Sequence, residues 1–376
     1  MDVLTHSLVG LNLGKAGLEK LSPYATTVCI MSANAPDIDV FSGFFGDRWT
    51  VLHYHRAITH SIVGTIALGV LIPTIFYLID LCFSRWQKRP ARIRYRGLVL
   101  VSVIAAATHP IMDWTNNYGV RPLLPWSDRW FYGDLVFIVD PYLWLVLGGA
   151  AFLLTSNRVL KLIGWAVLGG AVMLLIFRIS PQRDLSETAI AFARTIWVMG
   201  VSAFILARAL NLQQRVGKSI AYVALVLMLC YWSALAWMHH DAYRQAQQKA
   251  EQTAANYGEH FLRVAAMPTA ASPMRWNCVA ETDRAMYRFS VNLGSESSSP
   301  QRYEKPSGRT EAMIDSVETD RRTEIFLGFA RFPIARLADN NCVGQTLVQF
   351  ADLRYTEPGG TRGNFSLNLP VACPAP

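Results

Sequence analysis

A histidine and an aspartate stand four residues apart at the end of an apolar segment, within residues 108–119. On a helix, His109 and Asp113 share one face, so both side chains could reach one metal ion. Ionisable groups are costly inside a membrane, and they mark functional sites there. A buried hydrogen bond between the two side chains is the alternative, and this pair taken alone supports both interpretations equally.

Other ionisable residues stand at the ends of three further apolar helices expected in the first third of the chain. His6 begins one helix, Asp37 and Asp39 follow another, and His60 precedes a third. Antiparallel packing would bring all four ends to one level. The predicted metal ligands are His6, Asp37, Asp39, His60, His109 and Asp113. This mixture of nitrogen and oxygen ligands suits zinc, with manganese as a second choice and one or two ions, better than magnesium or calcium.

Each proposed ligand also has a purely structural explanation. His6 could be exposed near the start of the chain, and Asp37 and Asp39 could cap the helix that follows them. His60 could extend to the lipid headgroups. His53 and His55 fit a loop or an outer layer better than direct ligation. Taken together, these explanations account less well for the clustering than a metal site does.

Three further residues are candidates for catalysis. Asp134 or Asp140 could act as a general base or orient a ligand. Arg56 could contact an anionic substrate such as a phosphate, and Arg121 and Arg129 could assist it. The sequence Asp140-Pro141 is equally typical of a helix start, with aspartate as the cap and proline in the first turn.

The composition indicates a membrane protein. Hydrophobic residues make up 52% of the 376 residues, and the mean hydropathy is +0.23. Apolar runs long enough to cross a bilayer predict an all-α, polytopic domain of about six to eight helices. The expected spans are residues 61–83, 97–112, 135–155, 160–177, 188–207 and 219–238, with two weaker apolar helices at 7–18 and 23–33.

The net charge of +8 is confined to the apolar part of the chain. Residues 1–240 contain 20 Lys and Arg against 12 Asp and Glu, whereas residues 241–376 contain 15 of each. This distribution argues for topology-determining loops and against nucleic-acid binding. Six cations lie within residues 83–96, which predicts a cytoplasmic loop. Counting spans from there places His60, residues 109–119 and the C-terminal region on the outer, periplasmic face.

The composition changes near Asp241, which divides the chain into a membrane domain at 1–240, with its site in 1–145, and a second domain at 241–376. Residues 241–257 predict a polar helical stalk. Strand-like segments at 285–293, 323–330, 345–350 and 364–369, with a Ser-rich loop at 294–306, predict a small β-rich (α+β) soluble domain.

The six cysteines fall into two groups. Cys278, Cys342 and Cys373 lie in the C-terminal domain and permit one disulfide with one thiol left over, if that domain is extracytoplasmic. Cys29, Cys82 and Cys230 lie in apolar segments and are expected to be small core residues.

Several linked motifs resemble those of a known family. They are Thr5-His6, Pro36-Asp37-Ile38-Asp39, residues 55–61 around His60, and residues 109–114, continued by Asn117-Tyr118-Gly119, Trp130, Asp134 and Asp140-Pro141. Over residues 1–144 they are similar to bacterial multi-pass inner-membrane proteins of the YdjM type, regarded as membrane-bound metal-dependent hydrolases. The resemblance implies a bacterial inner membrane and a metal site formed by the six predicted ligands. A weaker similarity to all-helical, zinc-dependent phospholipases C suggests phosphoester hydrolysis.

The sequence therefore predicts a membrane-embedded, metal-dependent hydrolase acting on a phosphoester, or another ester, of a lipid or lipid-linked compound. A non-catalytic membrane protein is the alternative. It could be an ion- or proton-coupled transporter, or a degenerate hydrolase with a structural or stress-response role. Ionisable groups at helix ends rather than at the bilayer midplane favour the enzyme. The lack of an assigned general base weighs against it. The sequence leaves the oligomeric state open.

Overall fold

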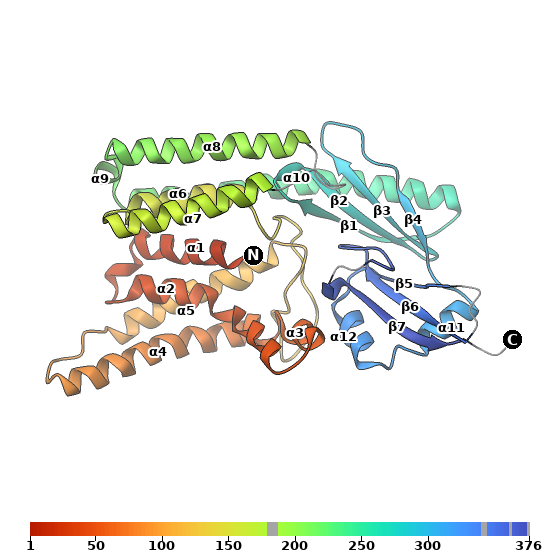
Figure 1. Ribbon diagram of the computed structural model, residues 1–376, viewed down its shortest axis with the longest axis horizontal. Helices are drawn as coiled ribbons and strands as arrows, with labels where there is room; N and C mark the ends of the chain where they lie inside the picture. Colours follow the sequence, from red (N-terminus) through yellow and green to blue (C-terminus); the bar gives the residue numbers. More distant parts are fainter. Residues whose placement is uncertain (179–186, 340–343, 361–362, 374–376) are drawn as a thin grey trace. The chain divides into compact units, whose positions relative to one another are not determined.

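The structure is a computed structural model that describes residues 1–178, 187–339, 344–360 and 363–373. The chain forms two compact units (Figure 1). The first comprises Met1–Ile38, Arg56–Trp237 and Pro268–Pro273, and it is helical. The second comprises Asp39–His55, Met238–Met267 and Met274–Pro376, and it contains the β-strands.

Helices that pack in pairs build the first unit. Helix α1 packs against α2 and α6, α2 packs against α5, α5 against α4, and α6 against α8 (Figure 1). The bounds are α1 (Val3–Ala16), α2 (Ala25–Asn34), α4 (Ile62–Trp86), α5 (Tyr95–Trp114), α6 (Pro141–Thr155), α7 (Val159–Arg178), α8 (Glu187–Ala209), α9 (Leu212–Val216) and α10 (Ser219–Tyr257). Asp2 caps α1 by accepting a hydrogen bond from the Thr5 backbone nitrogen.

Five of the described helices, α4, α5, α7, α8 and α10, are long and apolar enough to cross a membrane. They confirm the predicted polytopic α-helical domain. The predicted span at 135–155 is wrong in its extent, because the helix begins only at Pro141 and has 15 residues. Residues before it form a loop, in which the backbone nitrogens of Leu135 and Val136 donate to the Thr115 carbonyl.

In the described residues, two small antiparallel sheets form the second unit, together with four α-helical segments. One sheet has the order β1-β2-β3-β4 and the other β5-β6-β7. The strands are β1 (Phe261–Thr269), β2 (Ser272–Thr282), β3 (Ala285–Asn292), β4 (Gln301–Glu304), β5 (Pro333–Leu337), β6 (Gln345–Asp352) and β7 (Ser366–Ala372). The helical segments are the end of α10, α3 (Arg48–Tyr54), α11 (Arg309–Asp315) and α12 (Arg321–Phe329). This arrangement confirms the predicted β-rich, α+β domain.

The first sheet is buried on both of its faces. Ala266, Cys278 and Tyr287 pack against alanines of α10, including Ala242 and Ala246. The alternate residues pack against the second sheet: Ala265, Met267, Val279 and Met286 contact Ile334, Ala351 and Leu353. Side chains of a strand point to opposite faces in turn, so these strands contain continuous apolar runs instead of an alternating pattern.

The second unit differs from the sequence prediction in four places. Strand β1 was not predicted, because its small apolar residues show no alternation. The predicted stalk is part of α10, but its alanines are buried on the sheet. The predicted strand at 323–330 is wrong: α12 is a helix, capped by Asp320, with Thr323, Phe326 and Phe329 buried on one side. The predicted loop at 294–306 contains strand β4.

The structure agrees only in part with what the sequence predicts for the cysteines. Cys373 is disulfide-bonded and Cys278 is a buried free thiol, while Cys342 lies outside the described residues. Cys29 is buried, as expected. Cys82 and Cys230 are exposed on α4 and α10, where they would face lipid rather than protein.

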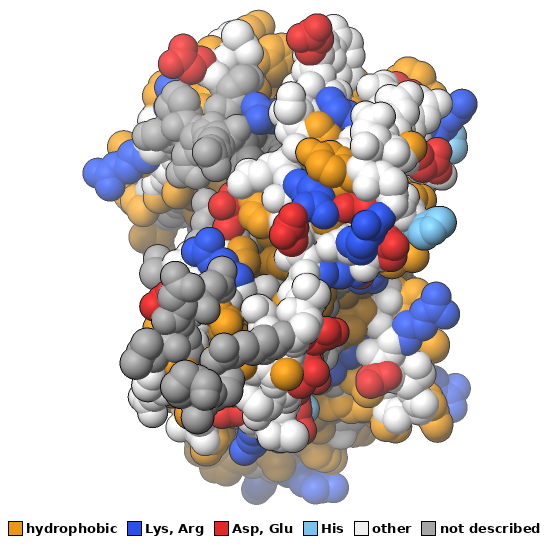
Figure 2. Space-filling view, turned by 90° about the vertical axis from the view of Figure 1, so that its right-hand side faces the viewer, with side chains coloured by type: hydrophobic (Ala, Val, Ile, Leu, Met, Phe, Trp, Pro, Cys, Tyr) orange, Lys and Arg blue, Asp and Glu red, His pale blue; other side chains and the backbone are white. Residues whose placement is uncertain are grey.

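Acidic and basic side chains lie interspersed on the face of the molecule seen in Figure 2. The mixture agrees with the equal numbers of cations and anions in residues 241–376. One pair of opposite charges lies in the interior of the second unit. The Asp352 carboxylate accepts from Arg354 Nη2 at 2.7 Å and from Nε at 2.8 Å, and Asp352 is fully buried.

We expect Asp352→Ala to destabilise the second unit by about 3–5 kcal/mol, because it leaves the Arg354 guanidinium, only 4% exposed, without its carboxylate. Hydrogen exchange of β5–β7 in the full chain would measure the loss. Glu304→Ala is the control, since the Glu304 side chain is 78% exposed and pairs with Arg302 at the surface. Equal exchange rates in the two variants would contradict the prediction.

Candidate metal centre

Side chains from separated parts of the N-terminal sequence converge inside the first unit. His6 lies on α1, Asp37 follows α2 in the 3-10 segment η2 (Ala35–Phe44), and His60 ends η3 (Ile58–His60) just before α4. His109 and Asp113 lie one turn apart near the end of α5. The structure thus brings together the helix ends that the sequence predicted to meet.

Four of these residues place one ligand atom each within 4.8 Å of the others: Asp37, His60, His109 and Asp113. The Nε2 atoms of His60 and His109 are 3.1 Å apart. Asp37 Oδ1 lies 3.5 Å from His60 Nε2 and 3.4 Å from His109 Nε2. Asp113 Oδ2 lies 3.3 Å from His60 Nε2 and 3.4 Å from His109 Nε2.

These distances match the edges of a tetrahedron around a metal ion. Bonds of about 2.0–2.1 Å to a tetrahedral zinc place the ligand atoms about 3.3–3.4 Å from one another. Five of the six separations in the group lie between 3.1 and 3.5 Å. In addition, Asp113 Oδ2 is buried and has no hydrogen-bond donor. The donor set and its spacing therefore fit a single divalent ion.

The Nδ1 atom of His109 fixes the tautomer of the ring. This atom lies 2.7 Å from the Ala33 carbonyl oxygen, which can only accept, so Nδ1 donates a proton there. A neutral His109 consequently presents a lone pair at Nε2, directly opposite His60 Nε2. A backbone carbonyl behind a histidine is the usual partner of a metal-ligating ring.

His6 approaches the group from one side without joining the four closest atoms. Its ring stacks on that of His109, with centroids 3.7 Å apart. Its Nε2 lies 3.4 Å from Asp113 Oδ1, and both ring nitrogens are buried without a hydrogen-bond partner. His6 is therefore available as a further ligand to the same ion or to a second one.

Arg56 contacts the group through Asp113. Its guanidinium donates to Asp113 Oδ1, Asn116 Oδ1 and the Gly119 carbonyl oxygen, each at 3.0 Å. The residue is only 3% exposed, and its backbone is left-handed with φ 55°. The Met1 amine also contacts Asp113 Oδ1. These contacts describe a positioning role for Arg56, and its predicted contact with a substrate stays a prediction.

The remaining candidates are not members of the four-residue group. Asp39 falls in the second unit, where its carboxylate is 3.1 Å from His55 Nδ1. Arg121 stacks on Trp130, and Arg129 on Phe131. The roles predicted for Asp39 and Asp134 stay predictions; Asp134 is buried in the loop that follows α5.

Asp140 serves as a helix cap. Its Oδ1 accepts from the backbone nitrogens of Tyr142 and Leu143, and its Oδ2 from the Tyr231 hydroxyl at 2.9 Å. Burial raises the pKa of this carboxyl to about 6. The contacts correspond to the helix-start interpretation of Asp140-Pro141, and a role as general base stays a prediction.

Sequence reasoning missed the residues that support the group. Trp144 Nε1 donates to Asp2 and to Thr5 Oγ1, which ties α6 to the start of α1 beside His6. Asn116 Oδ1 accepts two hydrogen bonds, one from the Arg56 guanidinium and one from the Tyr118 backbone nitrogen. The motif Asp2-x-x-Thr5 is a capping signal for the start of α1, but it does not indicate the contact with Trp144. These contacts depend on tertiary packing.

Comparison with known proteins gives a consistent result for the N-terminal half. Residues 1–185 match the model of the family described as YdjM inner membrane protein. The chain is 32% identical to the inner membrane protein YbcI of Escherichia coli over 133 residues, which are 35% of this chain and 70% of that protein. It is 27% identical to the uncharacterized protein YfhP of Bacillus subtilis over 155 residues, 39% of this chain and 43% of YfhP. No solved structure matches.

We expect Arg56→Lys to lower the stability of the detergent-solubilised protein by roughly 2–4 kcal/mol. A lysine ammonium cannot reproduce three hydrogen bonds in a fixed fork, and a buried charge-assisted bond contributes about 1.5–3 kcal/mol. Thermal unfolding would measure the change. Arg129→Lys is the matched control, because Arg129 is exposed and should tolerate the exchange. A control variant as unstable as Arg56→Lys would contradict the assignment.

Asp140 predicts an unusual dependence of stability on pH. Its folded-state pKa of about 6 lies above the ordinary value of 3.8, so the folded state favours the neutral carboxyl. The resulting stabilisation is present below about pH 4 and is lost as the pH rises through about 6, a change of about 3 kcal/mol.

Asp140→Asn provides the reference for that measurement, since asparagine caps helices equally well and does not titrate. Thermal unfolding of both proteins between pH 4 and 7.5 should show the stability of the parent falling relative to the variant as the pH rises. Parallel curves would disprove the raised pKa.

Proposed function

The chain belongs to the YdjM inner membrane protein family, and from that premise we propose that it is a membrane-embedded, metal-dependent hydrolase. The proposed substrate is a phosphoester of a lipid or a lipid-linked compound. The relatives' names specify no reaction, and the alignment spans less than half the length of YfhP. The proposal therefore depends on the geometry of the site.

The single observation that carries the proposal is the near-tetrahedral arrangement of Asp37, His60, His109 and Asp113. In a purely hydrogen-bonded network, one proton could join the Nε2 atoms of His60 and His109, which are 3.1 Å apart. That proton would not satisfy Asp113 Oδ2, which is buried and has no hydrogen-bond donor. A divalent cation at the centre of the group satisfies all four atoms at once, which supports metal binding over a purely structural network.

The residues around the group suit hydrolysis. A bound divalent metal would lower the pKa of a water molecule and withdraw charge from a phosphoryl oxygen. Arg56 and Asn116 hold Asp113 in place, and the Ala33 carbonyl holds the ring of His109. His60, His109 and Asp113 are buried, whereas the Asp37 side chain is 22% exposed. A substrate would therefore reach the group from the side of Asp37.

A lipid-derived substrate is favoured by the apolar surroundings. Ile111 and Trp114 lie on α5 beside His109 and Asp113, and both are exposed, at 54% and 41%. Ile58 and Ile62 flank His60 and are also exposed. Because α4 and α5 are long enough to cross a membrane, these side chains would contact lipid. A phosphate ester at the headgroup level would then lie close to Asp37.

We also propose that the C-terminal domain lies outside the cytoplasm. The disulfide bond of Cys373 supports this placement, because disulfides persist in oxidising compartments. The six cations of residues 83–96 support it as well when α6 is counted as a fifth crossing after that loop, because basic loops prefer the cytoplasm. A reporter protein fused after Pro376 and active only in the cytoplasm would overturn it.

The metal content of the detergent-purified protein tests the site directly. We expect about one or two equivalents of zinc or manganese in the parent and at least tenfold less in His60→Ala/His109→Ala, because two of the four ligand atoms are then missing. His260→Ala is the control, since His260 is exposed and belongs to the second unit. Near-zero metal in all three proteins, even after incubation with zinc and manganese, would leave the non-catalytic alternative in place.

Hydrolysis of a fluorogenic phosphodiester by the metal-loaded parent tests the activity. The rate should fall to background in the double variant and on chelation, and return when metal is restored. If the protein binds metal but hydrolyses no lipid phosphoester, the metal site stands and the proposed hydrolase activity is wrong.

A further inference from the structure

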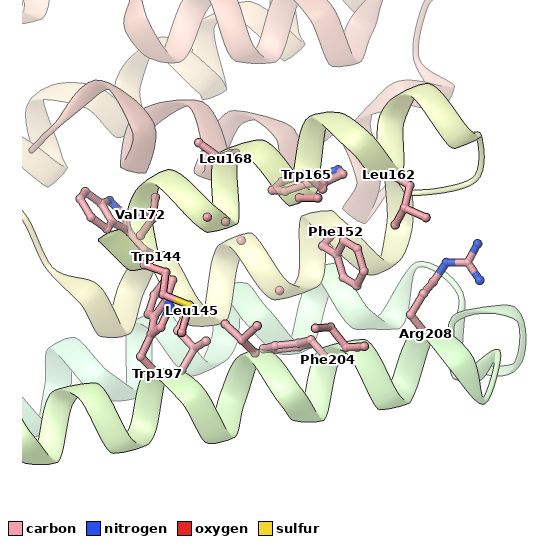
Figure 3. A pocket seen from close by; sticks show the side chains of 18 of the residues that line it. Trp144, Leu145, Phe152, Leu162, Trp165, Leu168, Val172, Trp197, Phe204 and Arg208 are labelled. Carbon is pink, nitrogen blue, oxygen red and sulfur yellow. The ribbon is translucent and has the colours of Figure 1, made fainter. Parts of the chain in front are cut away.

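A second feature of the first unit lies among helices that carry almost no ionisable groups. An elongated cavity of about 750 Å³ lies between α6, α7 and α8, with Leu4 and Leu8 of α1 at its wall (Figure 3). Its lining is apolar except for Arg208 and Asn211. Figure 3 shows Arg208 at one end and Trp144 and Trp197 at the other.

Glycines explain why the cavity exists. Helices α6 and α8 approach closely, because Phe204 packs directly on Gly149 and Leu145 on Gly200. Helix α7 stands away from this pair: a Cβ atom added at Gly169 or Gly170 would meet nothing within 4 Å. The space between them therefore stays open on the α7 side.

The dimensions of the cavity match a lipid chain. Its volume lies within the roughly 300–1,000 Å³ typical of small-molecule sites. Trp197 and Arg208 are eleven residues apart on α8, which is about 16 Å at the helical rise of 1.5 Å per residue. One leaflet of the hydrocarbon core is about 15 Å thick, half of the roughly 30 Å total. An acyl chain would thus span the cavity from one end to the other.

The polar end of the cavity is positively charged. Arg208 donates to Ser156 Oγ at 3.1 Å, to the Ser156 carbonyl oxygen at 3.0 Å and to Asn211 Oδ1 at 3.4 Å, all of them uncharged partners. Four further cations lie at this end, in or beside the connections of α6 with α7 and of α8 with α10: Arg158, Lys161, Arg215 and Lys218. Residues 156–161 and 208–218 contain no Asp or Glu. A lipid phosphate here would meet only cations.

We propose that this cavity binds one anionic phospholipid, with an acyl chain between α6, α7 and α8 and the phosphate at Arg208. None of the four closest metal-centre residues lines the cavity, and the polar end lies at the end of α6 opposite to Asp140. The site is therefore separate from the metal centre, and the proposal does not depend on hydrolysis.

Photocrosslinking in lipid nanodiscs tests the acyl-chain part. Phosphatidylglycerol with a diazirine in its acyl chain should label peptides of α6, α7 and α8 in the parent. Gly169→Leu should reduce this labelling about tenfold by filling the cavity. Gly164→Leu is the matched control, because Gly164 lies on the same helix and also faces open space but does not line the cavity. Ala166→Phe, from another lining position, is a second filling variant in case Gly169→Leu fails to fold.

Competition in the same assay tests the phosphate part. Unlabelled phosphatidylglycerol should displace the probe about tenfold better than phosphatidylcholine in the parent and in Arg215→Gln, and this preference should vanish in Arg208→Gln. Equal labelling of Gly169→Leu and Gly164→Leu would overturn the acyl-chain site, and no lipid preference in the parent would overturn the anion site. Crosslinks between two chains at α7, formed by a bifunctional reagent in the absence of lipid labelling, would overturn the lipid site and make this face a contact between copies of the protein.

Discussion

The Nε2 atoms of His60 and His109 face each other at 3.1 Å, and the N-terminal helices must hold both rings in this position. The Nδ1 atom of His109 donates to the Ala33 carbonyl, so a neutral ring directs a lone pair toward His60. A proton on His60 could join these two nitrogens, but the carboxylates of Asp37 and Asp113 beside them add negative charge, and Asp113 Oδ2 has no donor. A cation at the centre would contact all four ligand atoms and offset this charge. The buried positions of His60, His109 and Asp113 are costly without it, and this cost links the fold to the proposed metal chemistry.

The helices reach this geometry because their backbones approach closely. A side chain at Gly10 of α1 would collide with the Cys29 carbonyl oxygen of α2, and one at Gly97 of α5 would collide with the Leu21 carbonyl oxygen. Small residues permit such contacts between apolar helices, where packing rather than water exclusion drives association. The loop after α5 is fixed in the same way, since the Gly133 nitrogen donates to the Trp114 carbonyl. The ends of α1, α2 and α5 are thereby held at one level, which a wider helix spacing would not allow.

The sequence predicted the membrane helices and the convergence of His6, Asp37, His60, His109 and Asp113, because apolar periodicity and helix-end positions are local signals. It did not predict that Arg56 turns inward, since its left-handed backbone and its contacts with Asp113 and Gly119 arise from tertiary packing. Strand β1 escaped detection because both of its faces are buried, and α12 was misassigned because Ile325 and Phe326 favour strands when read alone. Local patterns thus located the ends of the helices, while the supporting contacts needed the three-dimensional structure.

Two sets of helices in the first unit have different roles. Helices α1, α2 and α5 carry the ionisable residues at their ends, where Arg56 and the Ala33 carbonyl fix them in position. Helices α6 to α8 contribute an apolar wall whose ionisable residues lie mainly near the helix ends. A reaction on a membrane-derived ester needs both parts, because the reacting group is polar and the rest of the molecule is hydrocarbon. A lipid bound at Arg208 would not be the substrate, because its phosphate would lie at the far end of α6 from Asp140. Its acyl chain would instead fill the space between α7 and the pair α6 and α8.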